Sequence, residues 1–253
     1  MSLLTVEDLQ VKINHQLICD GLSFAVQPGD CWGILGANGC GKTTLLHTLA
    51  GFRAPIHGQL FLQGQNFLTY SLKEAAQKKG ILLQNTTFTF PQTVFDYCLA
   101  GRHPHLALFK TETAEDHRIV QECLLEMDLL HLRDQLVQTL SGGEQRRLAI
   151  ATLFTQQPLL YFLDEPTNHL DVKHQINILN YARERVALFG GATIMAIHDI
   201  NLAQRFCNKF LMLFEEGKYL LGDALLTEEN LSRLYNHPIK LIKAEGKNIW
   251  VAN

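Results

Sequence analysis

A glycine-rich segment between residues 36 and 43 has the residue types and the spacing of a phosphate-binding loop. Glycines allow backbone N–H groups to turn inward around an anion, a lysine adds a mobile positive charge for the outer phosphates, and a threonine hydroxyl can ligate Mg²⁺. The motif therefore predicts a site for a nucleoside triphosphate with magnesium. Together with the threonine that follows it, the segment consists of Gly36, Ala37, Asn38, Gly39, Cys40, Gly41, Lys42, Thr43 and Thr44.

Two adjacent carboxylates, Asp164 and Glu165, directly follow five apolar residues. The apolar run at residues 159–163 is typical of a buried strand, so both acids should project from the end of that strand. There Asp164 could hold the magnesium shell, and Glu165, if it faces the terminal phosphate, could orient or deprotonate the attacking water. The alternative, two solvated acids at the start of a loop, is disfavoured by the strongly apolar run.

Polar residues also end two other apolar runs. Gln84 follows one of them, and His198 ends another, with Asp199 placed to cap the helix that comes next. A histidine at a strand end is more often structural than catalytic, and a single glutamine indicates still less. What makes both residues candidates is their order along the chain relative to the phosphate loop.

The elements that position these residues are predicted to alternate between strands and helices. Apolar residues two apart within residues 4–26 predict half-buried strands. Four short, nearly continuous apolar runs predict buried strands: residues 31–35, 81–83, 159–163 and 192–197. Near the end of the chain, residues 210–221 are typical of a hairpin.

Helices are predicted in the intervals between these strands. One follows the phosphate loop, and a short one opens at Ser71, which has Glu74 at capping-box spacing. Residues 84–158 are mainly helical, with apolar residues at the three-to-four spacing of a helix. Two more helices cover residues 176–186 and 227–235. The alternation predicts an α/β fold with a parallel sheet and ligands at the strand ends.

Composition excludes several classes of protein. The chain has 253 residues, 47% hydrophobic and 19% charged, which is ordinary for a globular protein with a substantial core. A formal net charge of -3 without a Lys/Arg-rich block makes nucleic acid an unexpected partner. No apolar stretch approaches the roughly 18 residues of a membrane span, so a cytosolic protein is expected. The six cysteines form no Cys-x-x-Cys pair and are interpreted as small core residues in a reducing compartment.

Residues 140–145, Leu-Ser-Gly-Gly-Glu-Gln, are identical to the signature sequence of ATP-binding cassette (ABC) proteins. Other motifs of that family follow in register. Gln84 resembles the Q-loop glutamine and His198 resembles the switch histidine. Asp164 with Glu165 resembles the Walker B pair, and residues 168–171 resemble the D-loop. The similarity extends from about residue 4 to residue 235, so the chain resembles an ABC ATPase over nearly its whole length.

The resemblance implies the fold of a P-loop NTPase. A RecA-like core would carry an N-terminal antiparallel β subdomain and a helical subdomain with the signature. We expect a single ABC ATPase domain over residues 1–253. The core and β subdomain would occupy about residues 1–84 and 158–253, and the helical subdomain about residues 85–157.

In this family each ATP lies between the phosphate loop of one subunit and the signature of its partner, so the resemblance implies a homodimer held by ATP. Signature residues would give the terminal phosphate a second set of hydrogen-bond donors. Glu165 would act as general base, His198 would contact the γ-phosphate, and Gln84 would couple magnesium to a membrane partner. ATP and Mg²⁺ are the expected cofactors.

The resemblance assigns three sets of site residues. The catalytic set is Glu165, His198 and Gln84. The nucleotide-binding set is the nine residues from Gly36 to Thr44, with Ser141, Gly142, Gly143, Gln145, Asp164 and Asp171. The Mg²⁺ ligands are Thr43, Gln84 and Asp164.

Two further segments resemble one branch of the family. Residues 101–105, Gly-Arg-His-Pro-His, and residues 226–235 are similar to importer ATPases for iron-siderophore, haem and vitamin B12. This implies separate transmembrane permease subunits, an external binding protein that acts indirectly, and a location on the cytoplasmic face of the plasma membrane. The related molybdate importers remain an alternative, and residues 101–105 could also be a helix-breaking loop without such meaning.

Two positions depart from the family pattern. Ile13, with Asn14 and His15 beside it, stands where an aromatic residue usually stacks on adenine, so we expect weaker base stacking and looser nucleotide selectivity. Thr152 stands where the helix after the signature normally carries arginine. Two other functions stay open: a soluble ABC ATPase in an assembly complex, such as that for iron-sulfur clusters, and a degenerate cassette that binds ATP without turnover.

Overall fold

The computed structural model describes the chain except residues 15, 85, 87, 108–109 and 245, so His15 beside Ile13 lies outside the described residues. The chain folds into two compact units. The first unit joins Met1–Leu68 to Ala192–Asn253, and the second unit is Thr69–Gly191. Among the described residues, none of the helices combines the length and apolar character that a membrane span requires.

The first unit contains an antiparallel sheet with the strand order β2-β1-β4-β5. Its strands are β1 (Leu4–Ile13), β2 (Gln16–Val26), β4 (His57–Leu62) and β5 (Gln65–Asn66). The two-residue spacing of apolar residues places Leu4 opposite Val26 in the core, as the sequence predicts. Gly58 has φ of +95°, and a Cβ there would lie 2.5 Å from the carbonyl oxygen of Asp8, so close backbone approach requires glycine.

The first unit also contains the strand order β10-β9-β3-β8. These strands are β3 (Cys31–Gly36), β8 (Ala192–Ala196), β9 (Lys209–Leu213) and β10 (Tyr219–Gly222). β3 runs parallel to β8 and β9, whereas β9 and β10 form the predicted hairpin around the short 3-10 turn η5 (Glu215–Gly217). The parallel strands are buried, which explains their continuous apolar sequences.

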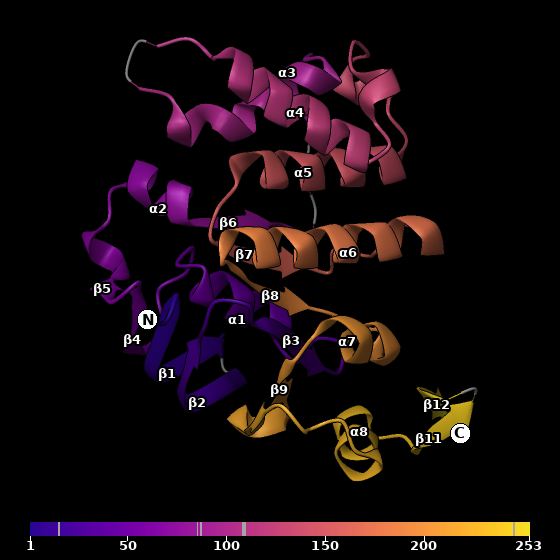
Figure 1. Ribbon diagram of the computed structural model, residues 1–253. Coiled ribbons are helices and arrows are strands. Elements are labelled where there is room, and N and C mark those ends of the chain that lie inside the picture. The colour runs from indigo at the N-terminus through magenta and orange to yellow at the C-terminus, as the bar shows by residue number, and fades with distance from the viewer. Residues whose placement is uncertain (15, 85, 87, 108–109, 245) are drawn as a thin grey trace. The chain divides into compact units, whose positions relative to one another are not determined.

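In the first unit one helix follows each of the parallel strands β3 and β8, and a third helix comes after β10 (Figure 1). They are α1 (Lys42–Leu49), α7 (Ile200–Phe206) and α8 (Glu228–Tyr235). Asp199 caps α7 by accepting hydrogen bonds from the backbone N–H groups of Asn201 and Leu202, as predicted. The chain ends in a hairpin of β11 (Ile239–Ala244) and β12 (Lys247–Ala252), which the sequence analysis did not identify.

The second unit pairs two parallel strands with a group of helices. β6 (Lys79–Leu82) lies beside β7 (Leu160–Asp164). The helices are α2 (Leu72–Lys78), α3 (Val94–Leu99), α4 (Ala114–Glu126), α5 (Gly142–Gln156) and α6 (Val172–Phe189), with 3-10 turns η2 (Ala100–His105), η3 (Leu130–Leu132) and η4 (Val137–Thr139); η1 (Phe67–Thr69) lies at the boundary of the units. Ser71 and Glu74 form the predicted capping box of α2.

The helices α3, α4 and α5 pack against one another (Figure 1). The residues with helical spacing in the sequence are buried there: Ile119, Val120, Cys123, Leu124 and Met127. The predicted limits of a helical subdomain, about residues 85–157, remain a prediction, and these three helices fall within them.

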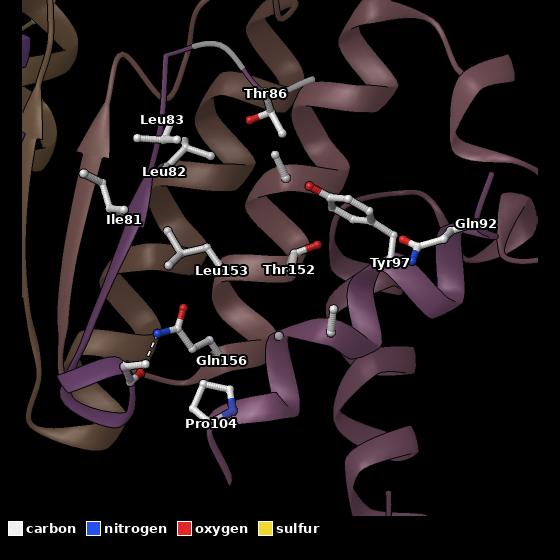
Figure 2. A pocket seen from close by; sticks show the side chains of 14 residues that line it. Ile81, Leu82, Leu83, Thr86, Gln92, Tyr97, Pro104, Thr152, Leu153 and Gln156 are labelled. Carbon is white, nitrogen blue, oxygen red and sulfur yellow. Dashed lines mark hydrogen bonds between the residues drawn. The ribbon is translucent and has the colours of Figure 1, made fainter. Parts of the chain in front are cut away.

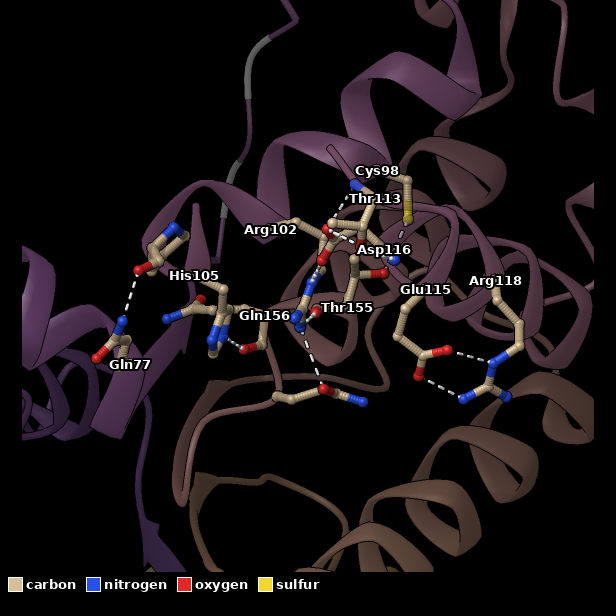
Figure 3. Close-up of polar contacts among 12 residues, drawn as sticks. Gln77, Cys98, Arg102, His105, Thr113, Glu115, Asp116, Arg118, Thr155 and Gln156 are labelled. Atoms are coloured by element: carbon tan, nitrogen blue, oxygen red, sulfur yellow. Dashed lines mark hydrogen bonds and ion pairs between the residues drawn. The ribbon is translucent and has the colours of Figure 1, made fainter. Parts of the chain in front are cut away.

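Arg102, in the Gly-Arg-His-Pro-His segment, fastens the helices of the second unit together (Figure 3). Its guanidinium lies 2.7 Å from the Asp116 carboxylate of α4, and it also donates to the carbonyl oxygen of Thr155 at 2.9 Å on α5. Burial disfavours the ionised Asp116, but hydrogen bonds from Thr113 and Arg102 outweigh it and lower the pKa of Asp116 to about 2. The segment thus connects α4 to α5, so it is not a loop without structural consequence.

Candidate nucleotide-binding and hydrolysis site

The phosphate loop lies in the first unit between β3 and α1. Lys42 is the first residue of α1, and its Nζ donates to the carbonyl oxygens of Gly36 at 2.8 Å and Ala37 at 3.0 Å. Residues 37–39 are exposed, whereas Cys40 and Lys42 are buried. Thr43 and Thr44, in the first turn of the helix, are half-buried. The loop is therefore an open backbone cradle with a lysine held along its inner side, which suits a phosphate chain.

Gly41 caps the N-terminus of α1 with φ of +101°, a conformation that strongly favours glycine. A Cβ at this position would also lie 2.6 Å from the buried side chain of Ile18. The neighbouring Cys40 is an inert thiol, because burial raises its pKa even though Lys42 acts in the opposite direction. The interpretation of this cysteine as a core residue agrees with that environment.

His198 comes two residues after β8, at the edge of the sheet where β3 leads into the phosphate loop. Ile34 of β3 pairs with Ala196 of β8, so the carboxyl ends of these two strands lie together. The half-buried His198 is followed by Asp199, whose capping of α7 fixes the turn. The structure therefore brings His198 to the end of the first unit that carries Gly36 to Thr44.

In the second unit, Gln84 and Glu165 meet beyond the ends of β6 and β7. The amide Nε2 of Gln84 donates to Oε2 of Glu165 at 3.0 Å, and Nδ2 of Asn168 donates to the same oxygen. Glu165 is nearly buried and has φ of +47°. Two amide donors thus fix the direction of this carboxylate, while Asp164 beside it is fully buried at the end of β7.

Arg146 is a further member of this cluster that the sequence analysis missed. Its buried guanidinium donates to the carbonyl oxygens of Gln84 at 3.1 Å, Asp164 at 2.6 Å and Glu165 at 2.8 Å, and also to that of Leu83. Burial lowers the pKa of Arg146, and the nearby carboxylates raise it. Because arginine has five N–H donors, one side chain can join both strand ends to the signature helix.

The signature segment begins α5, with Ser141 as its N-cap. Glu144 completes a capping box, because its carboxylate accepts from the N–H and the hydroxyl of Ser141, both at 2.7 Å. Hydrogen bonding to Ser141 lowers the pKa of Glu144, so this acid is a cap of the helix. Gln145 donates to the carbonyl oxygen of Val137 at 3.4 Å.

The two signature glycines are not required by the surrounding fold. A Cβ on Gly142 would meet nothing within 4 Å, and one on Gly143 would make only an ordinary contact with the His169 carbonyl oxygen at 3.7 Å. A cavity of 500 Å³ brings Gly142 and Gln145 together with Gln84. The glycines therefore leave backbone N–H groups at the start of a 15-residue helix open to an approaching anion.

Asp171, in the segment predicted as the D-loop, caps the N-terminus of α6. Its carboxylate accepts from the backbone N–H of His174 at 2.9 Å, and this bond and a second one from the His174 ring lower its pKa. The structure thus assigns Asp171 a capping role, and its predicted contact with nucleotide remains a prediction.

Comparison with known proteins identifies the family of this chain. The family model for "ABC transporter" matches residues 19–168, more than half of the chain. The chain belongs to the ABC transporter family. The ferric enterobactin transport ATP-binding protein FepC of Escherichia coli is 35% identical over 232 residues, covering 90% of this chain and 85% of FepC. The hemin import ATP-binding protein HmuV of Vibrio parahaemolyticus is 33% identical, covering 92% and 91%.

Solved structures agree with this assignment. A metal-chelate type ABC transporter in an inward-facing conformation matches with a TM-score of 0.84 and 27% identity, covering 100% of this chain and 98% of that one. These comparisons confirm the predicted α/β fold of an ABC ATPase. As a member of this family, the cassette is an ATPase that couples ATP hydrolysis to transport.

The residues predicted to hold magnesium all offer oxygen. They are the hydroxyl of Thr43, the amide of Gln84, whose nitrogen is taken by Glu165, and the carboxylate of Asp164. Across the described residues, no group of three or more His, Cys, Asp or Glu side chains is arranged to hold a metal. A set of oxygen donors with one carboxylate suits Mg²⁺, which prefers oxygen ligands and is usually bound by one or two carboxylates together with water and phosphate.

Proposed function

We propose that this cassette is the ATP-hydrolysing subunit of an importer for metal complexes of the iron-siderophore or haem type, working under a separate transmembrane permease. The observation that carries the hydrolytic part is the Glu165 carboxylate, held by two amides beside the buried Asp164. The cargo class is supported by relatives named for ferric enterobactin and hemin transport. Vitamin B12 and molybdate, which the sequence left open, stay alternatives.

The residues of the cassette divide the work of hydrolysis between them. The backbone cradle and Lys42 bind the phosphates, and Lys42 exchanges its bonds to Gly36 and Ala37 for bonds to phosphate oxygens. Glu165 takes a proton from the attacking water, and His198 donates to the γ-phosphate. Thr43, Gln84 and Asp164 would hold Mg²⁺, which would supply positive charge against the phosphates.

The ATP-bound state is proposed to be a homodimer. Ser141, Gly142, Gly143 and Gln145 of one subunit would contact the ATP held by the phosphate loop of the other, and Asp171 would lie beside that contact. Support comes from the open space at Gly142, which the fold of one chain does not use. The N-terminus of a 15-residue helix adds a partial positive charge suited to the γ-phosphate.

The expected test of the hydrolytic role is Glu165→Gln. Removing the proton acceptor should lower phosphate release by about 100-fold or more, while nucleotide still binds. Glu184→Gln, which changes an exposed acid on α6, is the matched control and should leave the rate unchanged. A Glu165→Gln cassette that still releases phosphate at the parent rate would contradict the role of Glu165.

A cavity in the second unit is proposed to receive a segment of the permease. It has a volume of 420 Å³ and is lined by Leu82, Leu83, Thr86, Tyr97, Thr152 and Gln156, among others. Figure 2 shows Thr152 and Leu153 of α5 lining it together with Tyr97 of α3. Leu83, which is 42% exposed, is adjacent to Gln84, and Gln84 donates a hydrogen bond to Glu165. A segment bound in this cavity would therefore affect the position of the Glu165 carboxylate through Gln84. We propose that the subunit lies on the cytoplasmic face of the membrane, and that an external binding protein affects it only through the permease.

Co-purification with the permease tests this surface. Leu83→Glu should reduce recovery of the membrane partner at least tenfold, because a charge would replace apolar surface, while ATP hydrolysis by the isolated chain persists. Leu188→Glu, at a residue of α6 that is 74% exposed, is the matched control. Recovery in a complex of water-soluble proteins, without a polytopic membrane protein, would favour the assembly ATPase instead.

A further inference from the structure

His174, in the first turn of α6, joins two motifs through its two ring nitrogens. Nδ1 lies 2.9 Å from each carboxylate oxygen of Asp171. Nε2 faces the guanidinium of Arg147 on α5 and forms a hydrogen bond with it. Only 15% of the His174 side chain is exposed, so these contacts are largely shielded from water.

The partners of His174 determine where its proton resides. Arginine can only donate hydrogen bonds, so Nε2 must be the acceptor from Arg147. The single ring proton is then on Nδ1, which donates to Asp171. A carboxylate, a neutral imidazole and a guanidinium thus form a chain, and the bond from Arg147 requires that Nε2 carry no proton.

The chain lies at the meeting point of the signature segment and the loop that ends at Asp171. A cavity of 220 Å³ is lined by Ser141, Gly143, Glu144 and Arg147 from one and by His169, Leu170, Asp171 and His174 from the other. Gln175, next to His174, donates to the carbonyl oxygens of Thr167 at 3.2 Å and Leu170 at 3.0 Å. Gln175 therefore ties the loop to the first turn of α6, and the Arg147 bond links that turn to α5 through His174.

We propose that His174 is a positioning residue that fixes the signature segment relative to the Asp171 loop, and that it does so only while singly protonated. A second proton would occupy Nε2, remove the acceptor and place a positive charge against Arg147. The junction would then loosen, and the two segments would no longer present their groups to one nucleotide together. The inference rests on the proposed function in one respect, because the ATP-bound dimer is what uses both segments.

Charged groups around His174 act in both directions. Asp171 and the carboxylate of Asp128, 3.8 Å from Nε2, favour a second proton, whereas Arg147 opposes it. Glu144 faces the same cavity, but its carboxylate is bonded to Ser141, and it also interacts with His131. His169 is the remaining titratable group of the lining. The measurement that follows therefore compares ATP hydrolysis at two pH values.

Two substitutions remove the hydrogen bonds of His174 to Asp171 and to Arg147 one at a time. His174→Asn retains an amide N–H near the position of Nδ1 and loses the acceptor for Arg147. His174→Gln retains a carbonyl oxygen near the position of Nε2 and loses the donor to Asp171. His57→Gln is the matched control, because His57 also bonds a carboxylate, that of Asp8, but on the exposed surface of the first unit.

The assay is ATP hydrolysis by the purified full chain between pH 8 and pH 6, with thermal unfolding measured on the same samples. We expect His174→Asn to lower kcat about tenfold at pH 8 and His174→Gln to lower it about threefold, with KM within twofold, because the phosphate loop is unchanged. Wild type and His57→Gln should lose activity on acidification to pH 6. The two His174 variants should lose a smaller fraction of their kcat between pH 8 and pH 6. The proposal is overturned if the variants lose kcat and thermal stability together while their loss of kcat between pH 8 and pH 6 equals that of wild type. His174 would then be merely structural.

A second arm separates this inference from the proposed dimer. Size-exclusion chromatography with ATP compares the Glu165→Gln parent with its His174→Asn derivative at pH 8. A dimeric parent and a mainly monomeric derivative support the inference, and equal dimerisation overturns it. A parent that never dimerises contradicts the proposed ATP-bound dimer, and the kcat and pH profiles then still decide the role of His174.

Discussion

The phosphate loop of the first unit and the signature segment of the second both place glycines at the start of a helix, but for different reasons. At Gly41 the backbone has φ of +101° and a Cβ would lie 2.6 Å from Ile18, so the fold itself demands glycine. At Gly142 a Cβ would meet nothing within 4 Å. The fold of its own unit therefore requires glycine at Gly41 of the phosphate loop, whereas the surrounding described residues do not require glycine at Gly142 of the signature.

The same difference appears in the polar groups of the two segments. Lys42 already lies against carbonyl oxygens of its own loop, so the cradle keeps its shape before a nucleotide arrives. Ser141 and Glu144 satisfy each other as a cap, and no residue of the described chain fills the space over Gly142. The phosphate-loop side of the proposed site is preorganised by folding, and we propose that a partner subunit completes the signature side.

Exchanging glycine for alanine in each segment gives the largest expected effect. Gly41→Ala should reduce the free energy of unfolding by about 2 to 4 kcal/mol, from backbone strain and the clash with Ile18. Gly142→Ala should leave it unchanged or raise it by about 0.5 kcal/mol, because the site is helical and open, yet lower ATP hydrolysis about tenfold. Denaturant unfolding and phosphate release measure the two quantities.

Gly39→Ala is the control within the phosphate loop, since Gly39 has φ of +77° but open space around it. It should cost only about 1 kcal/mol of backbone strain. The comparison of the two segments fails if Gly142→Ala proves as destabilising as Gly41→Ala.

Ser141→Arg should abolish ATP-driven dimerisation while nucleotide binding to the monomer stays nearly intact. Its cost in folding should be only about 1 kcal/mol, the scale of one lost N-cap. Size-exclusion chromatography of the Glu165→Gln background with ATP, together with nucleotide titration, measures both effects. Thr113→Arg, which removes the capping-box residue of α4, is the control for the cap alone and should dimerise normally. Loss of monomer binding in Ser141→Arg would contradict the assignment of the signature to the partner's nucleotide.

Much of the fold follows from local sequence, because apolar periodicity directly reports which faces of an element are buried. The strand ends that carry Gln84, Asp164 and His198 were predictable in this way, and so were the caps at Ser71 and Asp199. The role of the Gly-Arg-His-Pro-His segment was not. Arg102 bonds Asp116 and Thr155, and a sequence pattern does not show which distant acceptor a guanidinium reaches.

Arg146 illustrates the same limit at the candidate site. Its acceptors are backbone carbonyl oxygens, including those of Leu83 and Asp164, and every residue has such an oxygen whatever its type. The only local signal was a pair of arginines directly after the signature. Gln84 and Glu165 could each be named as candidates, but their bond, and the place of Asn168 in it, depend on the pairing of β6 with β7.

The smallest expected effect concerns the base of the nucleotide and not its phosphates. Ile13 is the half-buried last residue of β1, and an aliphatic side chain offers no ring for stacking. Ile13→Tyr should tighten ATP binding by about 1 kcal/mol, the scale of one aromatic contact, and the parent should hydrolyse GTP within about tenfold of its ATP rate. Lys12→Tyr, one residue earlier and on the opposite face of the strand, is the matched control. Unchanged affinity in Ile13→Tyr would show that the base is held elsewhere. The phosphate loop would then bind ATP through contacts with its phosphates alone.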